Sequence, residues 1–206
     1  MRHWSQYNVL FLIAVATFMC ALSAHADSDR EGSLEVTVAG GISSPTDNYA
    51  DVAAVGKAYV FGLGFTPRSM ITLGFEYGFN SNDFVETSKY YVSKLLGETF
   101  RSGQFSTSRM GISAKFLSSG KPATMYARLA IAQWRNEIQI NTDKSGYFGS
   151  EEYLGFVLGI GFQTSLLSAI GISGEFAYSG FDSRAVEQST DIQILVGLQW
   201  VTHKKP

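Results

Sequence analysis

Large apolar and small or polar side chains alternate along residues 57–79. Before a short interruption at Pro67, one face of the pattern holds Tyr59, Phe61, Leu63 and Phe65. After it, the same face continues with Ile71, Leu73, Phe75, Tyr77 and Phe79. The other face has glycine at four of its eight positions, and the rest are Ala58, Val60, Thr72 and Glu76. A period of two residues is typical of β-strands, so this stretch predicts a β-hairpin.

The same alternation returns five times in the remaining chain after residue 106 and once before the hairpin, at residues 33–41. Together these segments predict roughly eight strands of about ten residues, the length that a tilted strand needs to cross a bilayer. Short links are predicted at Pro67, Gly120 and Ser165. Long loops are predicted at residues 42–56, 80–104, 135–152 and 181–190. For residues 80–104 the pattern leaves open a short helix or an extension of the strands.

The large apolar face and the strict alternation of short and long links favour an all-β fold. We predict an eight-stranded antiparallel up-and-down transmembrane β-barrel, with short periplasmic turns and long extracellular loops. Aromatic residues near both strand ends agree with interfacial girdles. The strand at residues 125–131 is the weakest, because Tyr126 and Trp134 share the parity of the polar face. The competing fold is a secreted lipocalin-like barrel, in which the large side chains would line a ligand cavity.

The first residues have the order of a secretory signal peptide. Arg2 precedes an apolar run at residues 9–22, and an Ala-His-Ala sequence ends at Ala26. We therefore predict a cleaved signal peptide over residues 1–26, a short periplasmic arm over residues 27–32, the barrel over residues 33–202 and a basic tail over residues 203–206. The run is too short to span a bilayer comfortably, which disfavours an anchoring helix.

Composition excludes several classes of function. Cys20 lies within the predicted signal peptide, so the mature chain has no disulfide. Removal of Arg2 leaves 15 basic against 18 acidic residues, which argues against nucleic acid as a partner. The mature chain retains only His203, so a histidine-activated serine of an outer-membrane lipid-modifying enzyme has little support, although a carboxylate-only mechanism stays open. Asp47, Asn48 and Asp51 do not have the spacing of a calcium loop. We expect no enzyme activity, cofactor or metal.

Six charged residues share the inward parity of the predicted barrel. They are Glu35, Glu76, Arg109, Lys115, Arg128 and Glu175. Isolated charges in a narrow lumen are costly, so we expect these groups to pair, with Glu76 and Arg109 on neighbouring strands. The resulting interpretation is a structural plug, and the alternative is a narrow ion-conducting path. The inward glycines predict some room for water.

The strand pattern resembles the small outer-membrane barrel family, which includes the OmpA transmembrane domain and the OmpX/Ail group of surface proteins. The resemblance implies a monomer in the outer membrane of a Gram-negative bacterium. An even number of strands then leaves both termini in the periplasm. The last strand is similar to the family's assembly signal for the barrel assembly machinery. That signal would consist of Ile192, Ile194, Val196, Leu198 and Trp200, although six residues follow Trp200.

The loop at residues 80–104 is the predicted site of contact with a partner. Its candidate contact residues are Lys89, Tyr90, Tyr91, Lys94 and Arg101. Positive charge and aromatic area suit the phosphates of lipopolysaccharide or the surface of an extracellular ligand. Ail-like barrels bind through such loops, and the resemblance therefore implies a surface protein with a structural or adhesive role. Asp83, Glu86 and Glu98 offset the charge, so a solvated loop without a partner is the competing interpretation.

Overall fold

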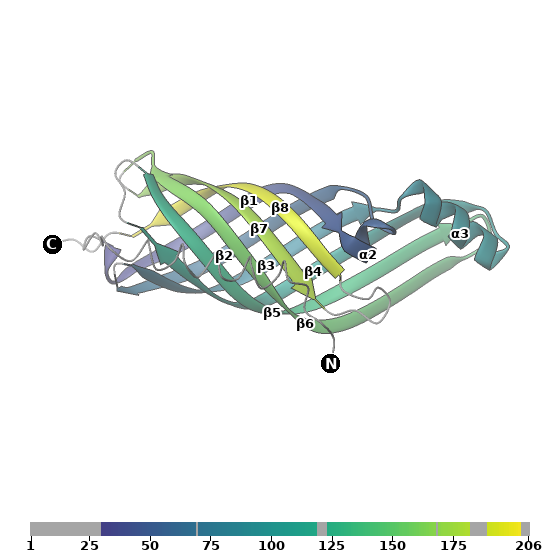
Figure 1. Ribbon diagram of the computed structural model, residues 1–206, viewed down its shortest axis with the longest axis horizontal. Coiled ribbons are helices and arrows are strands. Elements are labelled where there is room, and N and C mark those ends of the chain that lie inside the picture. The colour runs from purple at the N-terminus through teal and green to yellow at the C-terminus, as the bar shows by residue number, and fades with distance from the viewer. Residues whose placement is uncertain (1–29, 69, 119–122, 168, 182–188, 203–206) are drawn as a thin grey trace.

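The computed structural model describes residues 30–68, 70–118, 123–167, 169–181 and 189–202. It confirms the predicted all-β class, because its eight antiparallel strands form one closed up-and-down barrel (Figure 1). The strands are β1 (Ser33–Thr46), β2 (Gly56–Arg68), β3 (Ile71–Asp83), β4 (Phe100–Leu117), β5 (Ala123–Thr142), β6 (Gly146–Ser165), β7 (Ile170–Phe181) and β8 (Ser189–Val201). Two helices, α2 (Asp47–Ala50) and α3 (Glu86–Leu96), lie at the end of the barrel that carries the long connections, here called the loop end. Neither is long and apolar enough to span a membrane.

The barrel closes between its first and last strands. β1 pairs with β8 from Glu35, opposite Val201, to Thr46, opposite Thr190. The backbone N–H of Thr202 donates to the carbonyl of Leu34 at 2.9 Å, so the closing contact continues past Trp200. A closed barrel leaves no unpaired strand edge within the wall, which is the condition for placing β-structure in lipid.

An apolar belt surrounds the outside of the barrel. Exposed side chains of the predicted large face include Tyr59, Phe61, Phe75, Leu198 and Trp200. On β3 the belt extends from Ile71 to Phe79, and eight residue steps of about 3.3 Å tilted by about 40° give a height of about 20 Å. The lipocalin-like alternative is wrong, because the large side chains point outward rather than into a cavity.

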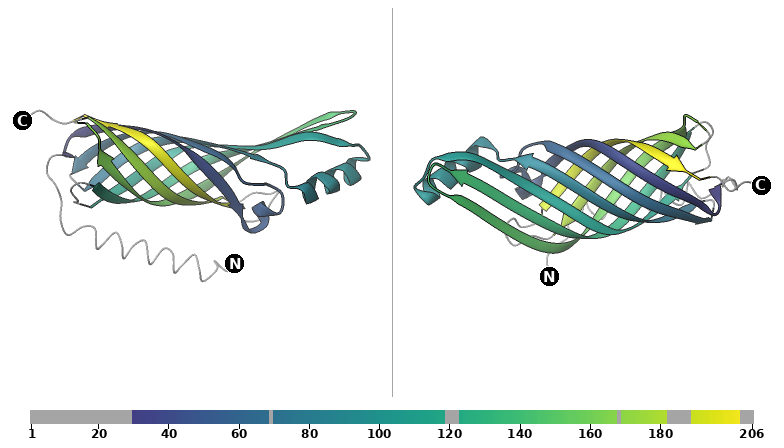
Figure 2. Two further views of the ribbon diagram at one scale, coloured as in Figure 1. Left: turned by 90° about the horizontal axis from the view of Figure 1, so that it is seen from above. Right: turned by 180° about the vertical axis from the view of Figure 1, so that it is seen from behind.

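Three strands are much longer than predicted. β4 has 18 residues, and β5 and β6 have 20 each, against 12 to 14 in the other strands. At the loop end these three strands extend beyond the rest of the barrel and carry α3 with them (Figures 1 and 2). We call residues 100–108 of β4, 133–142 of β5 and 146–154 of β6, together with α3, the outer projection. At about 3.3 Å per residue and a similar tilt, it rises about 20 Å above the belt.

The predicted loop at residues 135–152 is therefore wrong, and the reason is an inversion of the apolar face. Below Gln133 the apolar residues of β5, such as Leu129 and Ile131, point outward. Above Gln133 the outward positions are polar, whereas Ile138 and Ile140 pack inward against a cluster of buried apolar residues. A strand that leaves the apolar belt must turn its polar face to water. The alternation therefore continues above Gln133, but the polar residues now face outward and the apolar residues inward. In the sequence this loss of the outward apolar face resembles the end of a strand.

Two other predicted loops are partly regular. Within residues 42–56, β1 continues to Thr46 and is followed by α2. Within residues 80–104, β3 continues to Asp83, α3 occupies Glu86–Leu96 and β4 begins at Phe100, so the helix and the strand extensions that the pattern left open are both present. α3 ends at Gly97, whose φ of 65° is in the left-handed region that glycine adopts without a steric cost.

Candidate functional site

Arg128 is the centre of the charged groups in the lumen. Its Nε donates to both carboxylate oxygens of Glu175 at 3.1 Å, and its two Nη atoms pair with Glu76 and Glu175. The hydroxyl of Tyr126 donates to Glu175 at 2.9 Å. These side chains come from β3, β5 and β7, so they join strands that are not all neighbours in the barrel wall. The single guanidinium of Arg128 therefore contacts two carboxylates.

A second cation, Arg109, lies between Arg128 and the loop end. Its Nε is 3.5 Å from Oε1 of Glu76, and its Nη1 donates to Oε1 of Gln193 at 3.3 Å. The guanidinium carbon lies 5.1 Å from the centroid of the Trp134 ring, a cation–π distance. The side chain is almost fully buried, so loss of these partners would leave a charge without compensation.

Asp191 belongs to the same region of the lumen, and the sequence analysis did not include it. Its carboxylate accepts hydrogen bonds from Ser43 at 3.0 Å, Asn80 at 2.8 Å and Gln193 at 2.7 Å. Asp191 has the same parity as Gln193 in β8, and this shared parity could have identified it as a lumen residue. The prediction placed the start of the strand one residue too late to use it.

Towards the other end of the barrel, Lys115 pairs with Glu35. The hydroxyl of Thr37 also donates to Glu35, at 3.1 Å, and the Nζ of Lys115 lies 4.9 Å from the centroid of the Tyr126 ring. The structure thus points all six predicted lumen residues inward. It divides them into a Glu35–Lys115 pair and a larger group of four around Arg128.

The room left by the inward glycines is filled by large side chains. A Cβ on Gly78 would lie 2.7 Å from Nε of Arg109, and one on Gly161 would lie 2.5 Å from the Tyr126 ring. Gly159 makes the same kind of room for Glu175, with a Cβ-to-carboxylate distance of 2.8 Å. A cavity of about 60 Å³ remains beside the Arg128 group, enough for a few water molecules.

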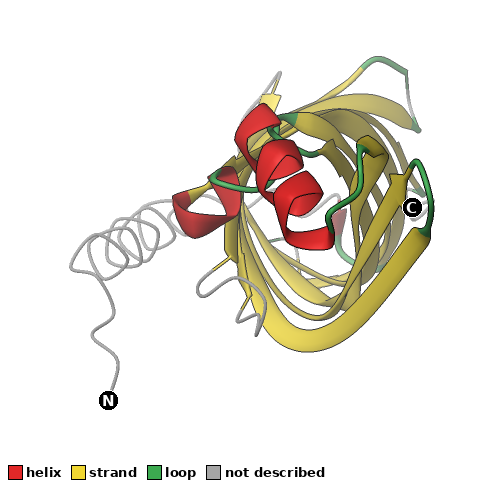
Figure 3. Ribbon diagram, turned by 90° about the vertical axis from the view of Figure 1, so that its right-hand side faces the viewer, coloured by secondary structure: helices red, strands yellow, loops and turns green. Residues whose placement is uncertain are grey.

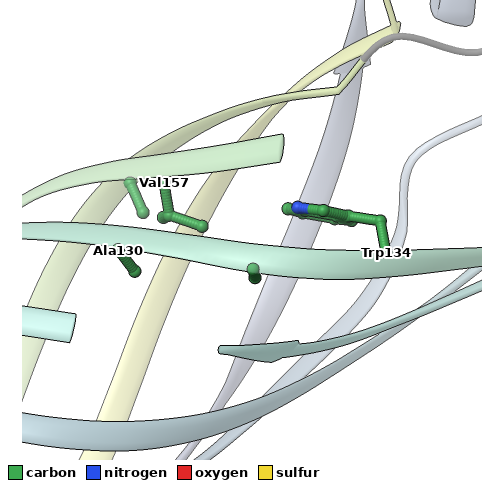
Figure 4. Packing of buried hydrophobic residues seen from close by; sticks show 5 residues of the cluster. Ala130, Trp134 and Val157 are labelled. Atoms are coloured by element: carbon green, nitrogen blue, oxygen red, sulfur yellow. The ribbon is translucent and has the colours of Figure 1, made fainter. Parts of the chain in front are cut away.

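Apolar clusters occupy the remaining interior towards the loop end. One cluster contains Ala130, Ala132, Trp134, Val157 and Ala177, and lies on the inner side of β5, β6 and β7 (Figure 4). A second, here called the projection core, contains Tyr49, Ala53, Phe84 and Phe105, with Val52, Phe100, Ile138 and Ile140 packed against it. Seen from the loop end, α2 and α3 lie at the mouth of the barrel (Figure 3). Polar groups thus fill the middle of the molecule, and apolar groups pack beyond them.

The predicted contact residues lie on the outer projection. Four of them, Lys89, Tyr90, Tyr91 and Lys94, are on α3, and Arg101 is exposed on β4. Tyr90 and Tyr91 are each 64% exposed, with their rings edge to face. The sequence analysis missed Leu95, which is 85% exposed on the same helix. Lys89 is bound to Glu86 at 2.5 Å, so it offers less free charge than the sequence indicated.

The remaining predictions concern the chain ends and reactive groups. The proposed assembly residues lie in β8, where Ile194, Val196, Leu198 and Trp200 are exposed and Ile192 is half-buried. The predicted signal peptide, His203 and the basic tail lie outside the described residues. Among the residues that the structure describes, no three His, Cys, Asp or Glu side chains are grouped so as to hold a metal ion. Asp47, one of the weak calcium candidates, accepts a hydrogen bond from Thr190 at 2.6 Å.

The comparisons identify the fold and leave the activity open. No family model and no curated protein sequence matches the chain. Among solved structures it is similar to Neisserial surface protein A, with 14% identity, a TM-score of 0.59, and coverage of 82% of this chain and 99% of that one. It is also similar to Ail of Yersinia pestis in complex with the heparin analogue sucrose octasulfate, with 11% identity, a TM-score of 0.56, and coverage of 84% and 99%. A major outer membrane protein of Thermus thermophilus has 10% identity, a TM-score of 0.59, and coverage of 83% and 99%. The resemblance to small outer-membrane barrels is confirmed as a likeness of fold.

Proposed function

We propose that this protein is a monomeric outer-membrane surface protein of a Gram-negative bacterium, whose barrel is a plugged anchor and whose outer projection contacts a ligand outside the cell. The apolar belt continues around the described barrel wall, which suits a monomer in contact with outer-membrane lipid and lipopolysaccharide. In the proposed orientation both termini lie in the periplasm, and the barrel assembly machinery inserts the chain through β8.

The observation that carries the proposal is the outer projection itself. It rises beyond the belt, so it adds nothing to the span of the membrane. Its β4 and β5 residues share an apolar core with the connections that contain Tyr49 and Phe84. It also has polar contacts, since Asp143 accepts the Thr99 N–H at 2.8 Å and Glu98 pairs with Thr142. An ordered structure of this kind that exposes Tyr90, Tyr91 and Leu95 is suited to recognition.

The heparin analogue in the Ail structure is a poor guide to the ligand of this chain. The residues of the projection and its connections, 80–104 and 135–152, contain five basic and seven acidic side chains. A polysulfated ligand requires an excess of positive charge. We therefore favour a protein surface that uses aromatic contacts over a sulfated sugar.

The ion-conducting alternative has weaker support. Arg128 bridges Glu76 and Glu175 across the lumen, and apolar side chains lie between this group and the loop end. The cavity of about 60 Å³ beside Arg128 is too small to form a path by itself. For an enzyme, the described residues contain neither histidine nor cysteine. We propose that the lumen groups stabilise the barrel.

The proposal can be tested with bacteria that express the protein on their surface. Deletion of residues 85–101 would also remove Phe100, which packs against the projection core, so substitution of the exposed face is sharper. Tyr90→Ser, Tyr91→Ser and Leu95→Gln combined should lower attachment to matrix proteins or cultured cells at least several-fold. Thr87→Ala, also exposed on α3, is the control. Equal attachment by wild type, the triple variant and a variant lacking residues 136–151 would exclude the projection as the contact site.

A further inference from the structure

One long edge of the outer projection pairs with no strand among the described residues. β5 and β6 pair from Ala123, opposite Thr164, to Asn141, opposite Gly146. β7 pairs with β6 only from Gly155, opposite Phe181, to Ser165. The nine residues of β6 from Gly146 to Leu154 therefore pair with β5 on one side, and no described residue pairs with them on the other. We call these residues the β6 edge.

The opposite edge of the projection, formed by β4, is mostly paired or covered. β3 pairs with β4 up to Asp83, opposite Gln104, so only Phe100–Gly103 extends past it. There the backbone N–H of Phe100 donates to Oγ of Ser93 in α3 at 3.0 Å, and α3 packs against this part of the chain. Among the described residues, the projection thus covers its short edge with a helix and leaves its long edge unpaired.

Soluble β-structure normally protects such an edge, because exposed N–H and C=O groups in an extended row pair with other chains. The usual protection is proline, charged side chains and above all lysine, a bulge or a covering segment, and of these the β6 edge carries only the carboxylates of Glu151 and Glu152. The sequence of the β6 edge, GYFGSEEYL, contains no proline or lysine, and its pairing with β5 is continuous. Its residues from Gly146 to Glu152 are all exposed. An added strand would find about four residues whose backbone groups point away from β5.

The side chains of the β6 edge indicate the chemistry of that strand. Each face offers an aromatic ring and a carboxylate, with Phe148 and Glu152 on one face and Tyr147 and Glu151 on the other. Between Gly146 and Leu154 there is no basic residue. Glu152 accepts from Gln133 at 2.9 Å and Glu151 from the Tyr153 hydroxyl, so neither has a cation as its hydrogen-bond donor in the described residues.

We propose that the β6 edge binds an extended segment of another protein as an additional strand, and that this segment carries basic residues at alternate positions. Backbone pairing provides the affinity. Basic residues at alternate positions share one face of the added strand, so in a given register they meet either Glu151 or Glu152, and that carboxylate selects a basic sequence over an acidic one. A second copy of this chain fits less well, because it would bring two further carboxylates to the same edge. The inference rests on the proposed function, in which the projection faces the outside of the cell.

The test uses purified, folded protein in detergent and three labelled octapeptides. They are an alternating Lys-Val peptide, an alternating Glu-Val peptide, and an alternating Lys-Pro peptide that has the same charge but cannot pair as a strand. We expect the Lys-Val peptide to bind at least ten-fold more tightly than either of the others. Its binding should slow amide hydrogen exchange within residues 146–154 and leave residues 86–96 unchanged.

Variants separate edge pairing from charge attraction. Glu151→Gln combined with Glu152→Gln should lower the affinity for the Lys-Val peptide several-fold. Because alternate N–H groups point away from β5, one of Gly149→Pro and Ser150→Pro should remove an edge donor and abolish binding. Unheated and boiled samples of that variant should still migrate differently in SDS gels, as expected of a folded barrel. The triple α3 variant should bind the peptide as wild type does.

Equal binding of the Lys-Val and Lys-Pro peptides would overturn the proposal in favour of simple charge attraction. No binding of the Lys-Val peptide at millimolar concentration, or unchanged exchange at residues 146–154, would also overturn it. These outcomes differ from failure of the proposed function, which is measured by attachment of whole cells. Peptide binding without attachment would retain the edge site and reject the surface role.

Discussion

Arg128 is the residue on which the lumen depends most. The sequence suggested coupling between Glu76 and Arg109, and the structure places those two groups 3.5 Å apart, whereas Arg128 contacts Glu76 and Glu175 directly. Loss of one partner from a buried pair is costly because the remaining charge is not solvated. Loss of Arg128 leaves Glu175 without a paired cation and leaves Glu76 with only the longer contact to Arg109.

We expect Arg128→Met to destabilise the barrel by about 3–5 kcal/mol, and Arg109→Met by less. In double-mutant cycles with Glu76→Gln, the coupling energy should be larger for Arg128 than for Arg109. Equilibrium unfolding in urea from lipid vesicles measures both quantities. Additive losses in the Glu76 and Arg128 cycle would contradict the proposed role of Arg128.

At the scale of elements, the outer projection is a small unit with its own core outside the apolar belt. Phe105 is buried, and its ring lies 5.1 Å from that of Phe84 and 5.7 Å from that of Tyr49. These contacts hold residues from two separate connections, β1–β2 and β3–β4, against the inner face of β4 and β5. We therefore expect that loss of this packing loosens the projection without unfolding the barrel wall.

Phe105→Ala should lower the stability of the projection by about 3 kcal/mol, because it removes a buried ring and leaves a cavity. Limited proteolysis should then cleave residues 84–105 faster than in wild type, while the barrel remains folded. Phe148→Ala, which truncates a ring that is 67% exposed, is the matched control and should leave cleavage unchanged. Loss of the folded barrel in the Phe105 variant would show that the two units are not independent.

For the whole molecule, closure between β1 and β8 is the decisive feature, since it pairs the first and last strands of the sheet. A closed barrel opens only when many hydrogen bonds break together, so detergent alone should open it slowly. In SDS gels an unheated sample should migrate differently from a boiled one. Identical migration would contradict a closed, detergent-resistant barrel.

Much of the fold could be predicted from the sequence, because the alternation of side chains within the belt depends on local geometry alone. A period of two residues, with Phe75 and Leu198 on one face and Glu76 and Gln199 on the other, requires strands with one apolar side. The same parity turned the six charged residues inward. It also contained the information on Asp191 and Trp134, although neither was assigned to the lumen network.

Only the tertiary structure decided where each strand ends and which charges meet. Residues 135–152 lack an outward apolar face because they have left the belt, and nothing local distinguishes this from a loop; Ile138 and Ile140 become informative only when the projection core lies opposite them. The partners of Arg128 come from strands distant in sequence, and their contact depends on barrel closure and on the space left by glycines such as Gly159. The open β6 edge likewise follows from the unequal lengths of β6 and β7, a property of the pair that neither segment encodes by itself.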